Sequence, residues 1–330
     1  MKTTLTSNFL VIVRIGMVML ISTVTSVWSQ TSPWPVRPIR IVVGFAAGGP
    51  TDIVARSFAE QASKGLGQPM VVDNKPGANT IIAAEFVASA TDGYSLLMAA
   101  TNHTMIPALY RDRVKFDAVK SFKPVCMISA APTVLVIGPS LQVKTLGEFV
   151  QKAKSSPLGV TYATPGIGSS GHFASEQFAQ QAAVKLTHVP YKGAAPAVAD
   201  VMAGQVDASF ATLASVLPLV KSGKLTALAI ASPQRSVQLP GVPTFDEAGV
   251  KGYSADAWYG LLAPSHTPEA VIKLLQREVL AFAGSAAGVE KLRSLGMEPQ
   301  SPCGEAFAAQ VAREVSDNIR IAKILDLKAD

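Results

Sequence analysis

The chain has 330 residues, of which 48% are hydrophobic and 16% charged, and its formal net charge at pH 7 is +6. A chain of this length can form two domains with large cores, and its composition excludes intrinsic disorder, which requires low hydrophobicity and high net charge. The basic residues are scattered, and aromatic residues make up only 7% of the chain. We expect no nucleic-acid partner, because that would need a basic stripe or a platform of aromatic rings.

The first thirty residues have the pattern of an export signal. Lys2 and Arg14 are basic, a short apolar run covers residues 15–21, and small residues lead up to Gln30. This pattern is typical of a secretory signal peptide. An uncleaved membrane anchor is the alternative, but Arg14 leaves less than the roughly 20 apolar residues of a spanning helix. We expect a signal peptide over residues 1–29 and a mature chain that is exported.

Short apolar segments rich in β-formers alternate with longer Ala-rich segments. The predicted strands, in chain order, cover residues 39–43, 70–72, 95–98, 133–137, 160–163 and 225–230. The predicted helices cover residues 53–63, 81–90, 173–184, 197–203 and 268–283. This alternation predicts an α/β fold whose parallel sheets carry helices on both faces.

The predicted helices have matching end signals. Pro50, Pro196 and Pro268 suit a first helical position, where a missing N–H removes no hydrogen bond. Thr267 suits an N-cap, and Gly204 suits a C-terminal stop. Gly- and Pro-bearing turns therefore lie where strands lead into helices, which is the edge at which open α/β sheets bind ligands.

Two of these turns combine glycines with polar side chains. The first covers residues 45–52, Phe-Ala-Ala-Gly-Gly-Pro-Thr-Asp, and the second covers residues 163–172, Ala-Thr-Pro-Gly-Ile-Gly-Ser-Ser-Gly-His. Glycines let the backbone approach a ligand, and the following helix start offers unpaired N–H groups with partial positive charge. Either turn taken alone also matches an ordinary tight turn.

The second turn resembles two other motifs without completing either. Its glycines fit G-x-G-x-x-G, but the acidic residue expected about 20 positions later is missing, so we expect no nicotinamide cofactor. A P-loop is excluded because His172 and Phe173 replace its Lys and Ser or Thr. Ser169 or Ser170 with His172 would suit a serine hydrolase, which stays as the alternative function although no G-x-S-x-G elbow is present.

The cysteines and histidines predict no catalytic or metal site. Cys126 and Cys303 lack CxxC spacing, and either a disulfide or two buried thiols fits them. The histidines form no H-x-x-x-H pair. We therefore expect no catalytic residue, metal or cofactor.

Several motifs recur in an order that points to one family. They are Gly-Gly-Pro-Thr-Asp at 48–52, Val-Asp-Asn-Lys-Pro-Gly-Ala at 72–78, Asp-Gly-Tyr-Ser-Leu-Leu at 92–97, Gly-Ile-Gly-Ser-Ser-Gly-His at 166–172, Val-Pro-Tyr-Lys-Gly at 189–193, Gly-Gln-Val-Asp at 204–207 and Trp-Tyr-Gly at 258–260. The resemblance that these motifs carry extends over nearly all of the mature chain. They closely resemble the Bug receptors, the TctC-like periplasmic solute-binding proteins of the tripartite tricarboxylate transporter family.

The resemblance implies a type II periplasmic-binding-protein fold with two α/β lobes and the ligand cleft between them. Residues 30–131 and 254–330 would form the first lobe, and residues 132–253 the second. It further implies a monomeric receptor in the periplasm that binds a small carboxylate or related organic acid and delivers it to membrane permease subunits. Scarce aromatic residues agree, since a sugar site would use stacking rings.

The resemblance also implies which residues contact the ligand. They are Phe45, Gly48, Gly49, Thr51 and Asn102 from the first lobe, and Thr164, Gly168, Ser169, Ser170, Lys192, Gly193, Ala194 and Asp207 from the second. Asp52 is expected to cap its own helix. The chain departs from many relatives at residues 76–80, where Pro-Gly-Ala-Asn-Thr replaces Pro-Gly-Ala-Gly-Gly, and this change alters a loop.

Overall fold

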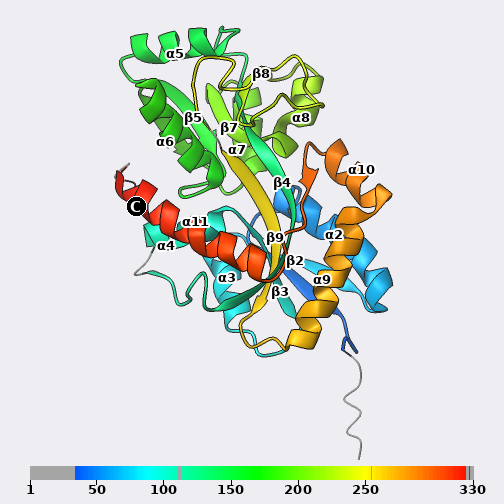
Figure 1. Cartoon of the computed structure of the whole chain (residues 1–330). Coiled ribbons are helices and arrows are strands. Elements are labelled where there is room, and N and C mark those ends of the chain that lie inside the picture. Colours follow the sequence, from blue (N-terminus) through cyan, green and yellow to red (C-terminus); the bar gives the residue numbers. More distant parts are fainter. Residues whose placement is uncertain (1–33, 111–112, 254, 325–326, 328–330) are drawn as a thin grey trace, which may run out of the picture. The chain divides into compact units, whose positions relative to one another are not determined.

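The computed structural model describes residues 34–110, 113–253, 255–324 and 327 (Figure 1). The predicted signal peptide lies outside these residues. From Arg37 onward the chain forms one compact unit, and the fold described here is that of this unit. No helix within the described ranges combines the length and apolar character that a membrane span requires.

The strands of the described residues form two groups that share the long strand β4 (Phe122–Ile137). The first group contains β1 (Ile39–Val43), β2 (Met70–Asn74), β3 (Ser95–Ala100), β9 (Asp256–Pro264) and β10 (Glu298–Pro299). The second contains β5 (Val160–Thr164), β6 (Leu186–Pro190), β7 (Ala208–Thr212) and β8 (Thr226–Ile230). The strand order is β2-β1-β3-β9-β4-β7-β5-β6, and β8 and β10 also pair with β4.

Strand β4 passes from one group to the other between two neighbouring residues. Pro132 is its last residue paired with β9, and Thr133 is its first residue paired with β7. Each group of strands has its own helices, so the chain folds into two α/β lobes (Figure 1). The division of the chain at 131/132 and 253/254 stays a prediction.

The helices of the first lobe cover both faces of its strands. They are α2 (Pro50–Leu66), the 3₁₀ turn η1 (Ala78–Thr80), α3 (Ile81–Ala88), α4 (Asn102–Tyr110), α9 (Glu269–Gly284), α10 (Ala286–Ser294) and α11 (Glu305–Ile324). Val87 of α3 and Phe307 of α11 belong to one core cluster with Val42 of β1. Helices α2 and α9 pack on each other through Phe58 and Phe282, whose ring centroids lie 6.0 Å apart.

In the second lobe, helices cover both faces of the strands, and alternate side chains of β4 pack against different helices. Its helices are α5 (Leu146–Ser155), α6 (Ser170–Ala182), α7 (Ala194–Met202) and α8 (Leu213–Lys221). Leu135 and Ile137 of β4 join the core beside α5 and α6, whereas Val134 and Val136 join the core beside α7 and α8. Successive side chains of β4 therefore pack on opposite faces, with a helix pair over each (Figure 1).

The prediction of wholly parallel sheets was wrong for two strands. Strands β1, β2 and β3 are parallel, as are β5, β6 and β7, but β4 and β9 run antiparallel to their neighbours. Both are buried along nearly their whole length. A strand buried on both faces is apolar throughout whichever way it runs, so its sequence does not reveal its direction.

The end signals of the helices were correct in part. Pro50 opens α2, and Gly204 follows α7 with φ of +75°. Pro196 is the third residue of α7, because Gly193 with φ of +137° starts that helix earlier. Pro268 has extended backbone and is itself the N-cap of α9, where Thr267 was expected.

The structure joins the two cysteines. Cys126 and Cys303 form a disulfide with a Cα–Cα distance of 4.0 Å, across 177 positions of sequence. Backbone hydrogen bonds flank it, from Met127 N to Pro302 O and from Gly304 N to Val125 O. The disulfide therefore fixes the segment before α11 against β4, and the alternative of two buried thiols does not hold.

Candidate functional site

A cavity lies between the lobes at the carboxyl ends of β1, β3, β5 and β7. The residues that line it from the first lobe include Phe45, Gly49, Thr51, Asn102 and Tyr259, and those from the second include Ser169, Ser170, Gly193, Ala194, Thr212 and Ser215. The volume of the cavity that is open to the centres of water molecules is about 50 Å³. One water needs on the order of 10–15 Å³ by this measure, so the cavity suits a small polar group.

Five helices of the described chain begin at this cavity. Thr51 of α2 and Asn102 of α4 line it from the first lobe, and Ser170 of α6, Ala194 of α7 and Ser215 of α8 line it from the second. Each helix start carries partial positive charge and unpaired N–H groups. None of the described lining residues carries a formal charge. The site is therefore suited to an anion that is held by dipoles and neutral donors.

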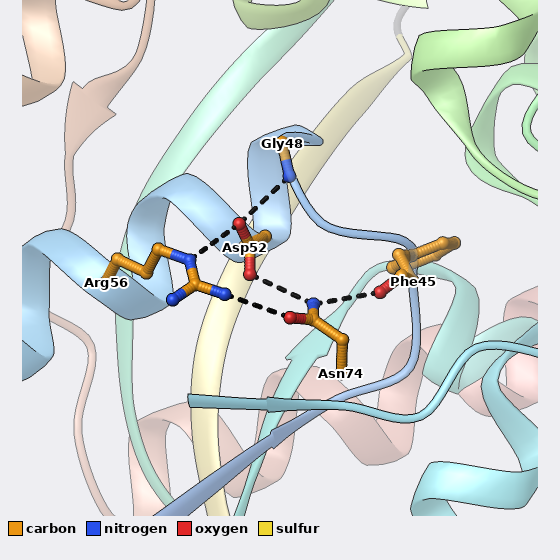
Figure 2. A network of polar contacts seen from close by, with 5 residues as sticks. All are labelled: Phe45, Gly48, Asp52, Arg56 and Asn74. Atoms are coloured by element: carbon orange, nitrogen blue, oxygen red, sulfur yellow. Dashed lines mark hydrogen bonds and ion pairs between the residues drawn. The ribbon is translucent and has the colours of Figure 1, made fainter. Parts of the chain in front are cut away.

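A buried carboxylate fixes the turn that leads into α2 (Figure 2). Asp52 Oδ2 accepts hydrogen bonds from Gly48 N at 3.0 Å and from Arg56 Nε at 2.9 Å. Asn74 Nδ2 donates to Asp52 Oδ1 at 2.9 Å and to Phe45 O at 3.1 Å, and Asn74 Oδ1 accepts from Arg56 at 3.0 Å (Figure 2). Asp52 is not the N-cap of α2 as predicted, because Gly49 occupies that position, but it stabilises the turn before the helix through the Gly48 amide.

The same network sets the pKa of Asp52 and determines which backbone amides of the turn remain free to bind a ligand. Burial opposes its negative charge, but the hydrogen bonds from Arg56, Gly48 and Asn74 outweigh burial and hold the pKa of Asp52 below its ordinary value. The Gly48 amide is occupied by this carboxylate. The amide of Thr51 has no intrahelical acceptor, and Thr51 is one of the residues that line the cavity.

The second turn is held by a histidine instead of a carboxylate. His172 Nδ1 accepts a hydrogen bond from Gly168 N at 3.2 Å, and Ser169 Oγ caps α6 by accepting from His172 N at 3.3 Å. The first two amides of α6, those of Ser170 and Gly171, have no intrahelical acceptor and belong to lining residues. The two turns therefore present backbone donors from opposite lobes.

His172, which holds the second turn, belongs to a stack of three rings. The ring centroids of His172 and His188 lie 4.2 Å apart, and those of His188 and Tyr162 lie 4.9 Å apart. Burial lowers the pKa of His172 to about 3, with a contribution from His188, and burial lowers the pKa of His188 to about 4. Both imidazoles are therefore neutral near pH 7, which keeps His172 Nδ1 available as an acceptor.

Polar side chains at the end of β7 complete the wall of the cavity. Thr212 Oγ1 and Ser215 Oγ lie 2.9 Å apart, and Tyr259 lines the same cavity. Burial raises the pKa of Tyr259 to about 12, and the neighbouring Thr212 side chain opposes the shift. Tyr259 is therefore a neutral phenol at the cavity.

The structure brings most of the predicted site residues together. Those that line the cavity are Phe45, Gly49, Thr51, Asn102, Ser169, Ser170, Gly193 and Ala194. They come from both lobes and from both Gly-rich turns. They are the residues that we retain in the proposed site.

Five predicted residues do not line the cavity: Gly48, Thr164, Gly168, Lys192 and Asp207. The amides of Gly48 and Gly168 are bonded to Asp52 and His172. Thr164 Oγ1 is bonded to His188 Nε2 at 2.7 Å and to the backbone of Gly166.

Lys192 and Asp207 are placed elsewhere by their strands. Lys192 follows the edge strand β6 and lines a neighbouring groove. Asp207 lies just before β7, where its Oδ2 accepts from Thr161 N at 3.0 Å and from Thr161 Oγ1 at 2.7 Å. That is the amino end of the parallel strands, opposite the cavity, so Asp207 has a structural role.

Several lining residues were not predicted. They include Ser209, Phe210, Thr212 and Ser215 from the end of β7 and the start of α8, and Ala257 and Tyr259 from β9. Trp-Tyr-Gly at 258–260 is one of the motifs of the resemblance, but no contact was assigned to it. Recognition of β7 as a strand would have exposed Thr212 and Ser215 by the rule that located the other turns.

The sequence comparisons identify the family of this chain. Residues 54–327 match the model of the tripartite tricarboxylate transporter family receptor, TctC. The chain belongs to this family. Protein BugT of Bordetella pertussis is 35% identical over 284 residues, which cover 86% of this chain and 87% of BugT.

Solved structures of TctC relatives have the same fold. The periplasmic binding protein BugD is 33% identical, with a TM-score of 0.85 over 90% of this chain and 100% of BugD. Rpa4515 of R. palustris with adipate is 33% identical, with a TM-score of 0.86 over 90% of this chain and 100% of that protein. MatC of Rhodopseudomonas palustris with bound malate is 32% identical, with a TM-score of 0.81 over 87% of this chain and 99% of MatC. The chain therefore has the two-lobed periplasmic-binding-protein fold.

The serine hydrolase alternative is not supported. Ser169 Oγ caps α6, and the ring of His172 faces Gly168 N and the ring of His188. Among the described residues of this site, no serine hydroxyl donates a hydrogen bond to a histidine ring nitrogen. The TctC family and the solved relatives are solute-binding receptors.

Proposed function

We propose that this TctC-family receptor captures a small organic acid in the cavity between its lobes. The observation that carries the proposal is the convergence of the α2 and α6 starts on a cavity without charged lining residues. A carboxylate there would accept from the amides of Thr51, Ser170 and Gly171 and from nearby hydroxyls. Such charge-assisted bonds are about twice as strong as neutral ones, and exclusion of water strengthens them further.

The relatives with bound acids support this ligand class. Rpa4515 was solved with adipate and MatC with malate. Both acids have two carboxylate groups, so the second group of a ligand would extend beyond the cavity described here. The groove that contains Lys192 adjoins the cavity and shares Phe45 and Pro165 with it. We propose that this groove receives the distal part of longer acids.

We further propose that the chain is exported, loses residues 1–29, and acts in the periplasm as a monomeric receptor without catalytic activity. The disulfide between Cys126 and Cys303 supports an oxidising compartment. Membership of the tripartite tricarboxylate transporter receptor family supports the proposal that the acid is released to membrane permease subunits. Mass spectrometry of the mature protein will locate its first residue, and light scattering will give its mass in solution.

Ligand binding is tested by calorimetry on the purified mature protein. The panel contains succinate, glutarate, adipate, malate and citrate, with glucose and succinamide as uncharged controls. We expect at least one acid to bind and to raise the unfolding free energy by about 2.7 kcal/mol at a concentration of 100 Kd. Recovery of the acid unchanged supports a receptor. Conversion of the acid, or binding of only the uncharged controls, would contradict the proposal.

A further inference from the structure

The two lobes touch each other beside the cavity, at Gly168 of the second turn. Gly168 has φ of +75°, and a Cβ atom added to it would lie 2.7 Å from both Asn79 Nδ2 and Leu109 Cδ1 and 3.5 Å from Tyr110 Cε2. These three neighbours belong to η1 and α4 of the first lobe. Tyr110 Oη also donates to Ile167 O at 3.4 Å. None of these residues is among those that line the cavity, so this contact between the lobes is separate from the proposed carboxylate site.

Apolar side chains extend the contact along α4. Phe173 of α6 belongs to one buried cluster with Met105 of α4 and Ala322 of α11, and Leu109 packs against this cluster. Phe173 and Met105 are 5% and 6% exposed. Because Phe173 belongs to the second lobe and Met105 to the first, the cluster buries apolar surface between the lobes. Such burial favours the closed arrangement.

The amide of Asn79 is the exception in this contact. Asn79 Nδ2 is buried, and no hydrogen-bond acceptor of the described chain lies within reach of it. The other end of the amide, Asn79 Oδ1, accepts from Asn102 Nδ2 at 3.4 Å. A buried donor without an acceptor is unfavourable, because it has lost its hydrogen bonds to water and gained none in return.

The second lobe covers this donor. The position that a Cβ of Gly168 would occupy is 2.7 Å from Asn79 Nδ2, so the backbone of Gly168 lies against the amide. An acid enters a cavity whose walls belong to both lobes, and entry therefore requires the lobes to move apart. Separation of the lobes removes Gly168 from Asn79 and exposes Nδ2 to water. The cost of the unpaired donor therefore applies only while the lobes are closed.

We propose that Asn79 opposes closure of the lobes and so lowers the affinity of the receptor for every acid that it binds. This inference rests on the proposed capture of an organic acid between the lobes. The measured affinity includes the equilibrium between separated and closed lobes, so a penalty on the closed state weakens binding by the same factor for each acid. The same penalty favours reopening of the lobes and, with it, release of the acid.

Asn79→Gly tests the proposal, because it removes the amide at a position whose φ of +49° suits glycine. Calorimetry compares this variant with the unmodified protein for the same panel of acids. We expect each acid that the unmodified protein binds to bind Asn79→Gly about 5-fold tighter or more, by factors that agree within about 2-fold.

The outcomes separate this inference from the proposed function. Unchanged or weaker binding by Asn79→Gly would overturn the inference and leave organic-acid capture intact. Factors that differ by more than about 2-fold between acids would make Asn79 a ligand contact and would also overturn it. Failure of every acid to bind either protein would contradict both proposals.

Two further variants separate closure from stability. Ala183→Gly is the matched control, because Ala183 has φ of +51° at the end of α6, is exposed and does not line the cavity. We expect its affinity for each acid to stay within about 2-fold of the unmodified protein. Leu109→Ala removes apolar surface from the contact, and we expect it to bind every acid about 3-fold more weakly or worse. Equal tightening by Ala183→Gly, or unchanged affinity in folded Leu109→Ala, would show that this contact does not control closure.

Discussion

The carboxylate of Asp52 accepts a hydrogen bond from the Gly48 amide at 3.0 Å, across the turn that leads into α2. The side chain of Asp52 is only 3% exposed, and it also bonds Arg56 and Asn74. This contact orients the turn so that Thr51 and Gly49 line the cavity. Asp52 is therefore a positioning residue that acts through the backbone of the turn.

Replacement of Asp52 by alanine is expected to weaken both the fold and ligand binding. The change leaves the Gly48 amide, Asn74 and Arg56 without their shared acceptor, and we expect a loss of about 2–3 kcal/mol in unfolding free energy. Urea denaturation will measure it. Asp73→Ala is the control, because Asp73 forms partly exposed ion pairs with Arg40 and Lys75 and should cost less than about 1 kcal/mol. Similar losses in the two variants would contradict the role of Asp52.

Replacement of Ser170 tests whether a backbone amide binds the acid. Ser170→Pro removes the first amide of α6 at a helical position where proline is well tolerated, and the preceding residue Ser169 has the extended backbone that proline requires. We expect a 10-fold or greater loss of affinity for the acid with little change in Tm. Ser170→Ala is the matched control, since it keeps the amide and loses only the hydroxyl. Unchanged affinity in Ser170→Pro would remove this amide from the site.

The buried histidines predict a dependence of stability on pH. His172 and His188 have pKa values lowered to about 3 and about 4, chiefly by burial, whereas an unfolded histidine titrates near 6.5. The unfolded state therefore binds more protons between these values. The stabilisation is complete above about pH 6.5 and is lost as pH falls, by on the order of 3 kcal/mol at pH 4 for His172 alone.

The measurement is urea denaturation between pH 7.5 and 4. His172→Asn keeps an acceptor for the Gly168 amide and cannot titrate, so we expect a shallower decline of stability with acid than in the unmodified protein. The exposed His266→Asn is the control and should leave the decline unchanged. A decline of the same steepness in all three proteins would contradict the assignment.

The loop of Ala78, Asn79 and Thr80, all of which have positive φ, predicts a stabilising substitution. Ala78 is exposed and has φ of +46°, so Ala78→Gly is expected to raise the unfolding free energy by about 0.5–1 kcal/mol through relief of strain. Ala203 is also exposed but has φ of −77°, and Ala203→Gly should lower stability by a similar amount. Thermal denaturation of both variants will show shifts in opposite directions. Destabilisation by both would contradict strain at Ala78.

Much of the fold was predictable because local patterns determine it. Strands such as β1 and β8 are short apolar runs between turns, and Pro50 signals the start of α2 correctly. The prediction missed β6, β7, β9 and the two-residue β10. Of these, β7 and β9 contain several small residues of low β propensity. Gly260 in β9 illustrates the reason, since a Cβ there would lie 2.5 Å from Phe307 Cζ. Packing of β9 against Phe307 of α11 therefore requires glycine at position 260, although glycine is disfavoured in strands.

The site was predictable where it consists of backbone and less so where it consists of side chains. Glycine and hydroxyl residues at strand ends located both turns, since the geometry of a helix start is local. Asp207 was assigned to the ligand by the resemblance alone. Recognition of β7 would have placed it just before a parallel strand, at the opposite edge from the cavity. Thr164 Oγ1 is hydrogen-bonded to His188, and the Gly168 amide is hydrogen-bonded to His172. No local sequence pattern predicts that these two groups are already hydrogen-bonded within the protein and so are not available to a ligand.

The disulfide between Cys126 and Cys303 has a further consequence for the integrity of the molecule. The second lobe lies wholly within the loop that this bond closes, since its strands run from Thr133 to Ile230. A protease that cuts once between the two cysteines therefore produces two polypeptides that remain covalently linked. A nicked receptor would keep its lobes attached and would separate into fragments only after reduction.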